Sequence, residues 1–475
     1  MEATGAIPNT HLTTGNRAAQ EISHRGRTLV LCFDGTAGQY DNENSNVVKL
    51  FGLLTKDPNE QLCYYQPGVG TWFKPGAISP LLSWGAKILD RAIAWYLDQH
   101  VLDGYKFIMQ NYQAGDKVCL FGFSRGAYTA RALAGMLHKV GLLPRDNDVQ
   151  MGFAYKLYQR EDEEGLRCCE GFKRTYCQNV QIEFVGVWDT VAAVGLIASR
   201  TLPFTNSNTS VKTFRHALSL DERRARYRAN LYHRMSQKFE DNAKKDTEFA
   251  VTSNPPSKSS TGLTSGSSSS DSSDGSSKQQ KSVLERQIST TIIESPKVAT
   301  KEEKARAPTF PTPVSDDVLE VWFTGAHSDV GGGSVHDEEE RSLSHISLRW
   351  MVRQVAASGC GVKFDAAALA WAKITIEPSN LEGEIDPLDR LDATAKVYDK
   401  LKIKPFWWIL EVLPMSYVWQ DKNGIWRKTF KWHLGRGRTI ESHKPQIHES
   451  VKIRQEQMDY KPKARWEEGS ETYVR

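Results

Sequence analysis

The sequence predicts an α/β fold with a mainly parallel sheet covered by helices on both faces. Four short apolar runs rich in β-branched or aromatic residues recur along the chain: Thr28–Phe33, Lys117–Phe121, Ile182–Val187 and Val318–Phe323. Long stretches with helical spacing lie between them, such as Ser83–Leu97 and Tyr128–Leu137. Strands that are apolar throughout and alternate with helices are typical of parallel sheets buried on both faces.

Composition agrees with a large globular protein. The 475 residues are 39% hydrophobic and 25% charged, which excludes a fully disordered, collagen-like or disulfide-scaffold chain. Seven cysteines without a CxxC pair give neither a zinc ribbon nor a secreted disulfide framework, and favour a reducing compartment. No apolar stretch reaches the roughly 18 residues needed to span a membrane. We therefore expect a cytoplasmic protein without a membrane span.

Five segments are predicted. Residues 1–27 are polar and form a flexible leader, because they lack the apolar core of a signal peptide. The range 253–282 contains 14 serines, so a disordered Ser-rich insertion is expected over 236–316, either as a tolerated surface insertion or as a phosphorylatable linker. It interrupts one catalytic domain, formed by 28–235 and 317–395. A basic, Trp-rich C-terminal extension follows at 396–475.

Polar or glycine-rich sequence follows each of the four apolar runs. These segments are Asp34-Gly35-Thr36, Gly122-Phe123-Ser124-Arg125-Gly126, Trp188-Asp189-Thr190 and Thr324–Asp329. In open α/β sheets, ligands bind at the carboxyl ends of the strands. The pattern therefore brings Asp, Ser, Asp and His side chains to one edge of one sheet.

The GxSxG pattern at 122–126 predicts a nucleophile elbow, because an apolar strand precedes it and a helical stretch follows. Ser124 is the candidate nucleophile, His327 its general base, and Asp189 the acid that orients the imidazole. Asp329 is the rival to Asp189 for the acid. The rivals to His327 as the base are His336 and His345.

An oxyanion hole needs two N–H donors. We expect one from the backbone of Arg125, directly after the nucleophile, and the other from Gly35 or Thr36. Asp34 is expected to support the loop that carries Gly35 and Thr36. The Arg125 side chain is a candidate to hold a substrate phosphate or carboxylate, or to form a structural ion pair.

Two other functions fit parts of this pattern. A metal-dependent hydrolase is the alternative enzyme if Asp34, Asp189, His327 and Asp329 converge as ligands. A non-catalytic member of the same fold would use the pocket for binding only. A haloacid-dehalogenase-type phosphatase is discounted, since Cys32 stands where that motif needs its nucleophilic aspartate. The serine mechanism needs no metal and no cofactor, so none is expected.

Six motifs together resemble one family. They are LCFDGT (31–36), YYQPGVGT (64–71), FGFSRGAYTAR (121–131), VGVWDTV (185–191), HALSLDERR (216–224) and VWFTGAHSDVGGG (321–333). The chain resembles a fungal-type member of the α/β-hydrolase family that includes the catalytic domain of bacterial type VI secretion phospholipase effectors. The resemblance implies a serine hydrolase acting on a lipid, phospholipid or other ester, with Ser124 as nucleophile and His327 and Asp189 completing the triad.

The C-terminal segment 396–475 differs from the rest in charge and aromatic content. It contains 17 basic and 10 acidic residues and six of the 13 tryptophans. Basic charge combined with tryptophan is typical of interfacial surfaces, so this segment is a candidate for peripheral contact with anionic lipid. The alternative is that the tryptophans only pack against the catalytic domain. No nucleic-acid motif accompanies the charge, so no nucleic-acid partner is expected.

Overall fold

The computed structural model describes residues 26–35, 40–68, 82–191, 211–232, 317–376, 385–421 and 425–475. The side chains of 82–96, Ser416, Val418 and Trp426 are not described. The expected leader, apart from Gly26 and Arg27, and the expected Ser-rich insertion lie outside these ranges, as does Thr36.

Eight strands form the main sheet, in the order β10-β9-β6-β5-β4-β3-β1-β2. Every neighbouring pair in it is parallel, which confirms the predicted parallel sheet. The strands are β1 (Thr28–Phe33), β2 (Gln61–Gln66), β3 (Lys117–Phe123), β4 (Ile182–Trp188), β5 (Val211–Ser219), β6 (Asp317–Phe323), β9 (Gln446–His448) and β10 (Thr472–Val474).

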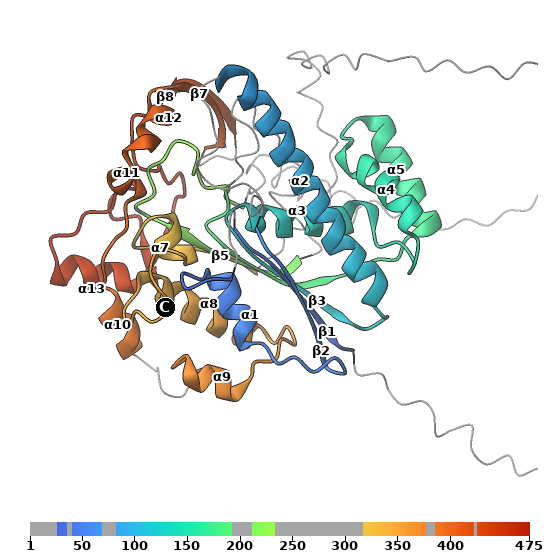
Figure 1. Cartoon of the computed structure of the whole chain (residues 1–475), viewed down its shortest axis with the longest axis horizontal. Helices are drawn as coiled ribbons and strands as arrows, with labels where there is room; N and C mark the ends of the chain where they lie inside the picture. Colours follow the sequence, from blue (N-terminus) through green and yellow to red (C-terminus); the bar gives the residue numbers. More distant parts are fainter. Residues whose placement is uncertain are drawn as a thin grey trace, which may run out of the picture. The chain divides into compact units, whose positions relative to one another are not determined.

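Helices cover both faces of the sheet, again as predicted (Figure 1). One face carries α2 (Leu82–Asn111) and α3 (Arg125–Val140), with α4 (Asp148–Gln159) and α5 (Glu163–Tyr176) packed on them. The other carries α1 (Asn46–Leu53) and α8 (Leu343–Ser358). The shorter helices are α7 (His327–Gly331), α9 (Ala366–Trp371), α10 (Pro387–Asp392), α11 (Lys400–Ile403), the 3-10 turn η3 (Pro405–Trp407), α12 (Trp408–Glu411) and α13 (Glu449–Gln457).

The side chains of strand β1 show that both faces of the sheet are buried. Leu29, Leu31 and Phe33 belong to the hydrophobic core on the α2–α3 face, whereas Val30 and Cys32 belong to the core on the α1–α8 face. Successive side chains of a strand point to opposite faces, so a strand covered on both sides is apolar at most positions rather than at every second one. The continuous apolar runs in the sequence have this cause.

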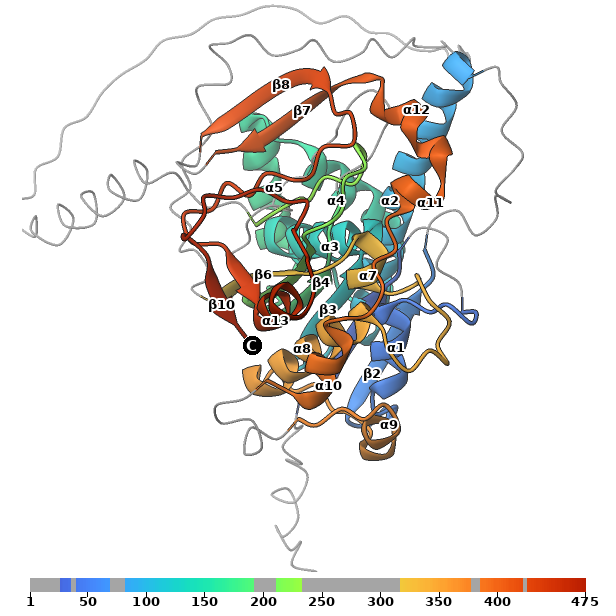
Figure 2. The ribbon, with the colours of Figure 1, turned by 90° about the vertical axis from the view of Figure 1, so that its left-hand side faces the viewer.

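The C-terminal segment is not only an extension of the domain. Its strands β9 and β10 continue the main sheet beyond β6, and α13 lies beside them near the C-terminus (Figure 2). Among the described residues of this segment, only the antiparallel hairpin of β7 (Pro414–Gln420) and β8 (Trp426–Trp432) forms a separate sheet. The C-terminal segment therefore also supplies one edge of the main sheet. Among the described residues, no helix combines the length and the apolar character needed to cross a membrane.

Close backbone contact between β1 and α3 gives a first prediction. A Cβ on Gly126 would lie 2.2 Å from the carbonyl oxygen of Phe33, so Gly126→Ala must displace the end of β1. We expect it to lower the free energy of unfolding by about 1–3 kcal/mol, measured by urea denaturation. Gly152→Ala is the control, because nothing lies within 4 Å of its Cβ in α4. It should raise stability by up to about 1 kcal/mol, and equal losses in both variants would contradict the contact argument.

Candidate active site

Ser124 lies at a sharp turn between β3 and α3. Its backbone has φ 58° and ψ −120°, a conformation that is strained for a residue with a Cβ. Glycines on both sides permit the turn: a Cβ on Gly122 would lie 2.5 Å from the Gly126 carbonyl oxygen. The Ser124 N–H donates to the carbonyl oxygen of Trp188 at the end of β4, at 3.0 Å. The predicted strand–turn–helix geometry is therefore present at the GxSxG pattern.

Three strand ends bring Ser124, Asp189 and His327 together. Asp189 directly follows β4, and His327 begins α7 a few residues after β6. The imidazole Nε2 of His327 lies 2.8 Å from Ser124 Oγ, and its Nδ1 lies 2.6 Å from Asp189 Oδ2. All three residues are buried. The side chains thus form one hydrogen-bonded chain from hydroxyl through imidazole to carboxylate.

Arg438 holds the far side of the Asp189 carboxylate. Its Nη1 lies 2.5 Å from Oδ1 and its Nη2 lies 2.9 Å from Oδ2, so the pair is bidentate. Nη1 also donates to the hydroxyl of Ser219 at 2.8 Å, and the Ser219 N–H donates to Asp189 Oδ1 at 3.0 Å. Arg438 belongs to the C-terminal segment, and nothing in its sequence context signals this role.

The electrostatics of the site follow from these contacts. Burial opposes the negative charge on Asp189, but the guanidinium of Arg438 and the hydrogen bond from His327 outweigh it. The pKa of Asp189 is therefore held well below its usual range. Burial lowers the pKa of His327 from its ordinary value, and the carboxylate of Asp189 offsets this only in part. At neutral pH the imidazole is neutral and can accept a proton from Ser124.

Aromatic rings and a second buried ion pair hold His327 in place. Its ring lies 4.6 Å from the Phe123 ring and 4.8 Å from the Tyr227 ring, between centroids. Its backbone N–H donates to Glu222 Oε2 at 3.2 Å, and Glu222 is paired with Arg224 at 2.7 Å. Glu222 and Arg224 both lie in the HALSLDERR motif, but no role was predicted for either of them.

The expected oxyanion donors are only partly present. Arg125 is the first residue of α3, where a backbone N–H has no acceptor within the helix. The Gly35 N–H, in contrast, donates to Asp34 Oδ1 at 2.6 Å, so it is already engaged and the expectation for Gly35 is corrected. Thr36 lies outside the described residues. Asp34 does tie its loop down, because Ser45 and Tyr65 also donate to its carboxylate.

Asp329 and the rival histidines have other partners. Asp329 Oδ2 accepts the N–H groups of Ala326 and Tyr398, at 2.9 and 3.0 Å, and burial raises its pKa to about 6. His336 is exposed and lies 3.9 Å from Glu43 Oε1. His345 lies 3.8 Å from Asp392 Oδ2. Among the carboxylates and histidines considered from the sequence, Asp189 is the one that contacts the His327 ring, and His327 is the one that contacts Ser124.

The four residues considered as metal ligands also have separate partners. Asp34 accepts from its own loop, Asp329 from Ala326 and Tyr398, and Asp189 from His327 and Arg438. Within the described ranges, no group of three or more His, Cys, Asp or Glu side chains is arranged to hold a metal ion. A neutral imidazole between a hydroxyl and a carboxylate suits proton transfer from that hydroxyl.

The fold and the site define a protein of the α/β-hydrolase-like class. A family model described as "T6SS, Phospholipase effector Tle1-like, catalytic domain" matches residues 27–354, and the chain belongs to this family. The matched range includes Ser124, Asp189 and His327 and ends before Arg438. The resemblance noted from six sequence motifs is thereby confirmed.

Relatives in other organisms extend the comparison. The uncharacterized protein YEL023C of Saccharomyces cerevisiae is 28% identical over an alignment 541 positions long, gaps included, which covers 90% of this chain and 79% of the yeast protein. A solved structure of the Tle1 effector bound to the VgrG spike from the type 6 secretion system has 13% identity and a TM-score of 0.37, covering 86% of this chain and 92% of that one.

A solved structure of an uncharacterized protein from Pseudomonas aeruginosa is similar at 18% identity and a TM-score of 0.36. The match covers 80% of this chain, which spans about half the length of the Pseudomonas chain, 52%.

The ion pair of Arg438 gives the second prediction. Arg438→Met would leave the completely buried Asp189 carboxylate with His327 as its main partner, at a cost of about 3–5 kcal/mol in the free energy of unfolding at pH 7. In the wild type the pKa of Asp189 is depressed, so this stabilisation is present above the unfolded pKa and is lost as pH falls. In Arg438→Met, burial without the guanidinium raises the pKa of Asp189, so this carboxyl becomes protonated as the pH falls. The difference in the free energy of unfolding between variant and wild type should therefore narrow toward about pH 5.

Chemical denaturation at pH 7 and at about pH 5 measures this difference in the free energy of unfolding between Arg438→Met and wild type. Arg436→Met is the control, since Arg436 is exposed on the same loop. It should stay within about 0.5 kcal/mol of wild type. An Arg438→Met variant as stable as this control would contradict the assigned ion pair.

Proposed function

We propose that the protein is a serine hydrolase that cleaves an ester of a lipid or phospholipid through an acyl-enzyme on Ser124. The observation that carries this proposal is the hydrogen-bonded chain of Ser124, His327 and Asp189 at the carboxyl edge of the sheet. Membership in the Tle1-like phospholipase effector family supports the lipid class of substrate. The strained conformation of Ser124 supports its role as nucleophile.

In the first half of the proposed reaction, Ser124 Oγ attacks the ester carbonyl carbon while His327 Nε2 takes the hydroxyl proton. Asp189 remains ionised, since Arg438 stabilises its charge, and it compensates the imidazolium that forms. Collapse of the tetrahedral intermediate breaks the ester C–O bond, and His327 returns the proton to the departing alcohol. The acyl group is then bonded to Ser124.

In the second half, water attacks the acyl-enzyme and His327 takes one of its protons. The second collapse breaks the bond to Ser124 Oγ, the proton returns to that oxygen, and the carboxylic acid leaves. The Arg125 N–H at the start of α3 supports stabilisation of the oxyanion in both halves, because backbone donors there need no reorganisation.

A fluorophosphonate probe tests the nucleophile. We expect it to label the wild type and not Ser124→Ala, and esterase turnover to fall by about 10⁴-fold or more in the variant. Ser358→Ala is the control, because that hydroxyl bonds the Val355 carbonyl in α8, and it should keep both label and turnover. A chelator should leave the rate unchanged. Equal labelling of wild type and Ser124→Ala would refute the mechanism.

Paired substitutions identify the acid. We expect Asp189→Asn to lower kcat by about 10⁴-fold, because an amide cannot hold the imidazole in the required tautomer. Asp329→Asn should retain activity within about tenfold, since an amide oxygen can still accept the Ala326 N–H. Kinetics on a short-chain ester with both variants make the comparison. The reverse order of effects would assign the role to Asp329.

A further inference from the structure

The described residues between Lys402 and Leu434 (402–421 and 425–434), here called the 402–434 surface, expose ten large apolar side chains. It comprises the end of α11, η3, α12 and the β7–β8 hairpin, which follow one another at the edge of the molecule (Figures 1 and 2). Of the 18 large hydrophobic side chains exposed in the described part of the chain, ten lie within 403–434. Six of them carry the argument: Phe406, Ile409, Val412, Leu413, Phe430 and Trp432.

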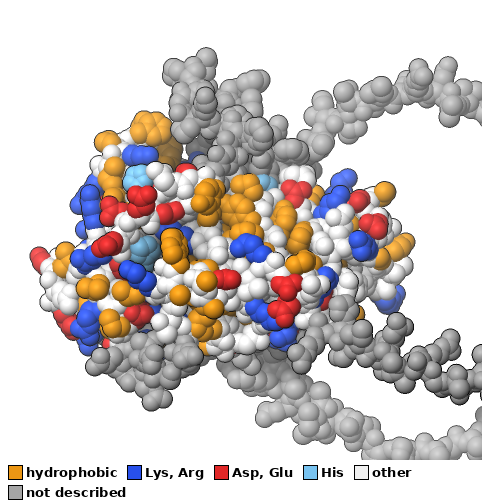
Figure 3. All heavy atoms as spheres, turned by 60° about the horizontal axis from the view of Figure 1, so that its bottom comes forward, with side chains coloured by type: hydrophobic (Ala, Val, Ile, Leu, Met, Phe, Trp, Pro, Cys, Tyr) orange, Lys and Arg blue, Asp and Glu red, His pale blue; other side chains and the backbone are white. Residues whose placement is uncertain are grey.

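The degree of exposure is high for aromatic residues. Phe406 and Phe430 are each 71% exposed and Trp432 is 57% exposed. On the face drawn in Figure 3, hydrophobic side chains lie among acidic and basic ones. A folded protein that leaves many large apolar side chains together in water has a binding partner for them.

Basic side chains surround this apolar region without matching acids. Lys402, Lys404, Lys428 and Lys431 are exposed, and none forms an ion pair with a described residue. The two acidic residues of the 402–434 surface, Glu411 and Asp421, already have other partners. Glu411 is buried and accepts from His433 and from backbone N–H groups, while Asp421 is paired with Arg427. The surface therefore presents positive charge that its own residues do not neutralise.

The 402–434 surface is also continuous with the candidate active site. Trp407 stands between the exposed Phe406 and Trp408 in sequence, and its ring lies 5.5 Å from the ring of Tyr227. Tyr227 in turn lies 4.8 Å from His327, between ring centroids. Arg224 stacks on Tyr227 at 3.5 Å and lies 5.0 Å from the Trp407 ring. Two ring contacts thus connect the exposed surface to the imidazole.

We propose that the 402–434 surface docks the protein on an anionic lipid bilayer. Aromatic side chains insert at the level of the head groups, and the exposed lysines meet lipid phosphates and carboxylates. Lysine is depleted at protein interfaces, so this combination favours a membrane over a protein partner. The proposal rests on the proposed function for its purpose, namely delivery of an ester lipid next to His327, but the docking itself is separable from catalysis.

Vesicle co-sedimentation of the full chain tests the docking. We expect the wild type to bind phosphatidylcholine vesicles containing phosphatidylserine, and to bind pure phosphatidylcholine or high-salt samples far less. Phe406→Ser/Phe430→Ser and Lys404→Glu/Lys431→Glu should each weaken the partition coefficient by at least about tenfold. These side chains are exposed, so the variants should fold; circular dichroism and thermal unfolding check this.

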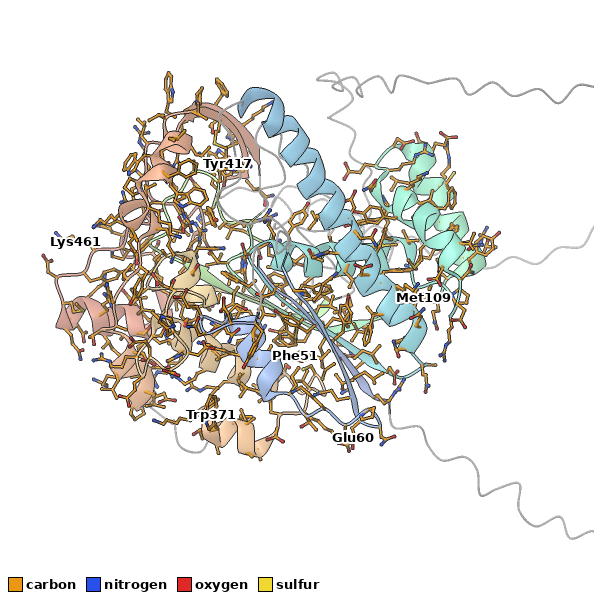
Figure 4. The ribbon with its side chains drawn as sticks, in the orientation of Figure 1. Phe51, Glu60, Met109, Trp371, Tyr417 and Lys461 are labelled. Carbon is orange, nitrogen blue, oxygen red and sulfur yellow. The ribbon has the colours of Figure 1, made fainter. Side chains whose placement is uncertain are left out.

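Two control variants outside the 402–434 surface show whether the loss of any exposed aromatic ring or positive charge weakens vesicle binding. Trp371→Ser removes a tryptophan of α9 that is 86% exposed. Trp371 is a suitable control because it lies far from Tyr417 of the β7–β8 hairpin (Figure 4). Lys461→Glu reverses an exposed charge outside the 402–434 surface. Both should bind vesicles like the wild type. Wild type that ignores anionic vesicles, or surface variants that bind as well as these controls, would overturn the proposal.

Two further readouts distinguish the remaining outcomes. Sedimentation velocity without lipid reports self-association: a wild-type dimer that the surface variants dissociate, with vesicle binding unchanged, would assign the surface to a second copy instead. Turnover of a water-soluble short-chain ester should be unchanged in the surface variants, while hydrolysis of vesicle lipid falls. Ester turnover without vesicle binding refutes only the docking. Vesicle binding without any ester turnover refutes only the proposed function.

Discussion

The buried charge of Asp189 is the constraint on which the rest of the site depends. The carboxylate has no exposure to water, and an ion in such a place must have partners that replace its hydration. It obtains them from three other segments: His327 at α7, Ser219 at the end of β5, and Arg438 of the C-terminal segment. Because His327 is one of the partners of this carboxylate, the same contact orients its ring toward Ser124.

The same constraint explains why the C-terminal segment belongs to the catalytic unit. Arg438 reaches Asp189 only because its own backbone is held, and the neighbouring Ile440 N–H donates to the carbonyl oxygen of Arg465. A Cβ on Gly437 would lie 1.8 Å from the Lys463 carbonyl oxygen, so two C-terminal stretches run in close contact there. With β9 and β10 in the main sheet, this segment supplies both an edge of the fold and a counter-charge for the site.

Sequence reasoning succeeded where the signal is local. The runs of β1, β3 and β4 and the end of β6 are mostly apolar because both faces of the sheet are buried there, and the glycines beside Ser124 indicate the sharp turn. It missed β5, whose buried Arg215 and His216 break the apolar pattern, and also β2, β9 and β10. Arg438 could not be found this way, because its partner lies 249 positions earlier and no spacing rule connects them.

Backbone strain and sheet pairing are coupled at the two strand ends that carry Ser124 and Asp189. Both residues have positive φ, 58° and 38°, which costs on the order of 1–3 kcal/mol each. Each is held by a hydrogen bond that extends the ladder by one residue: Ser124 N–H donates to Trp188, and Asp189 N–H donates to Ala217, at 3.0 and 2.7 Å. The parallel register thus positions the reactive groups directly, because the hydroxyl follows β3 and the carboxylate follows β4, so a shift of β3 relative to β4 changes the distance between them.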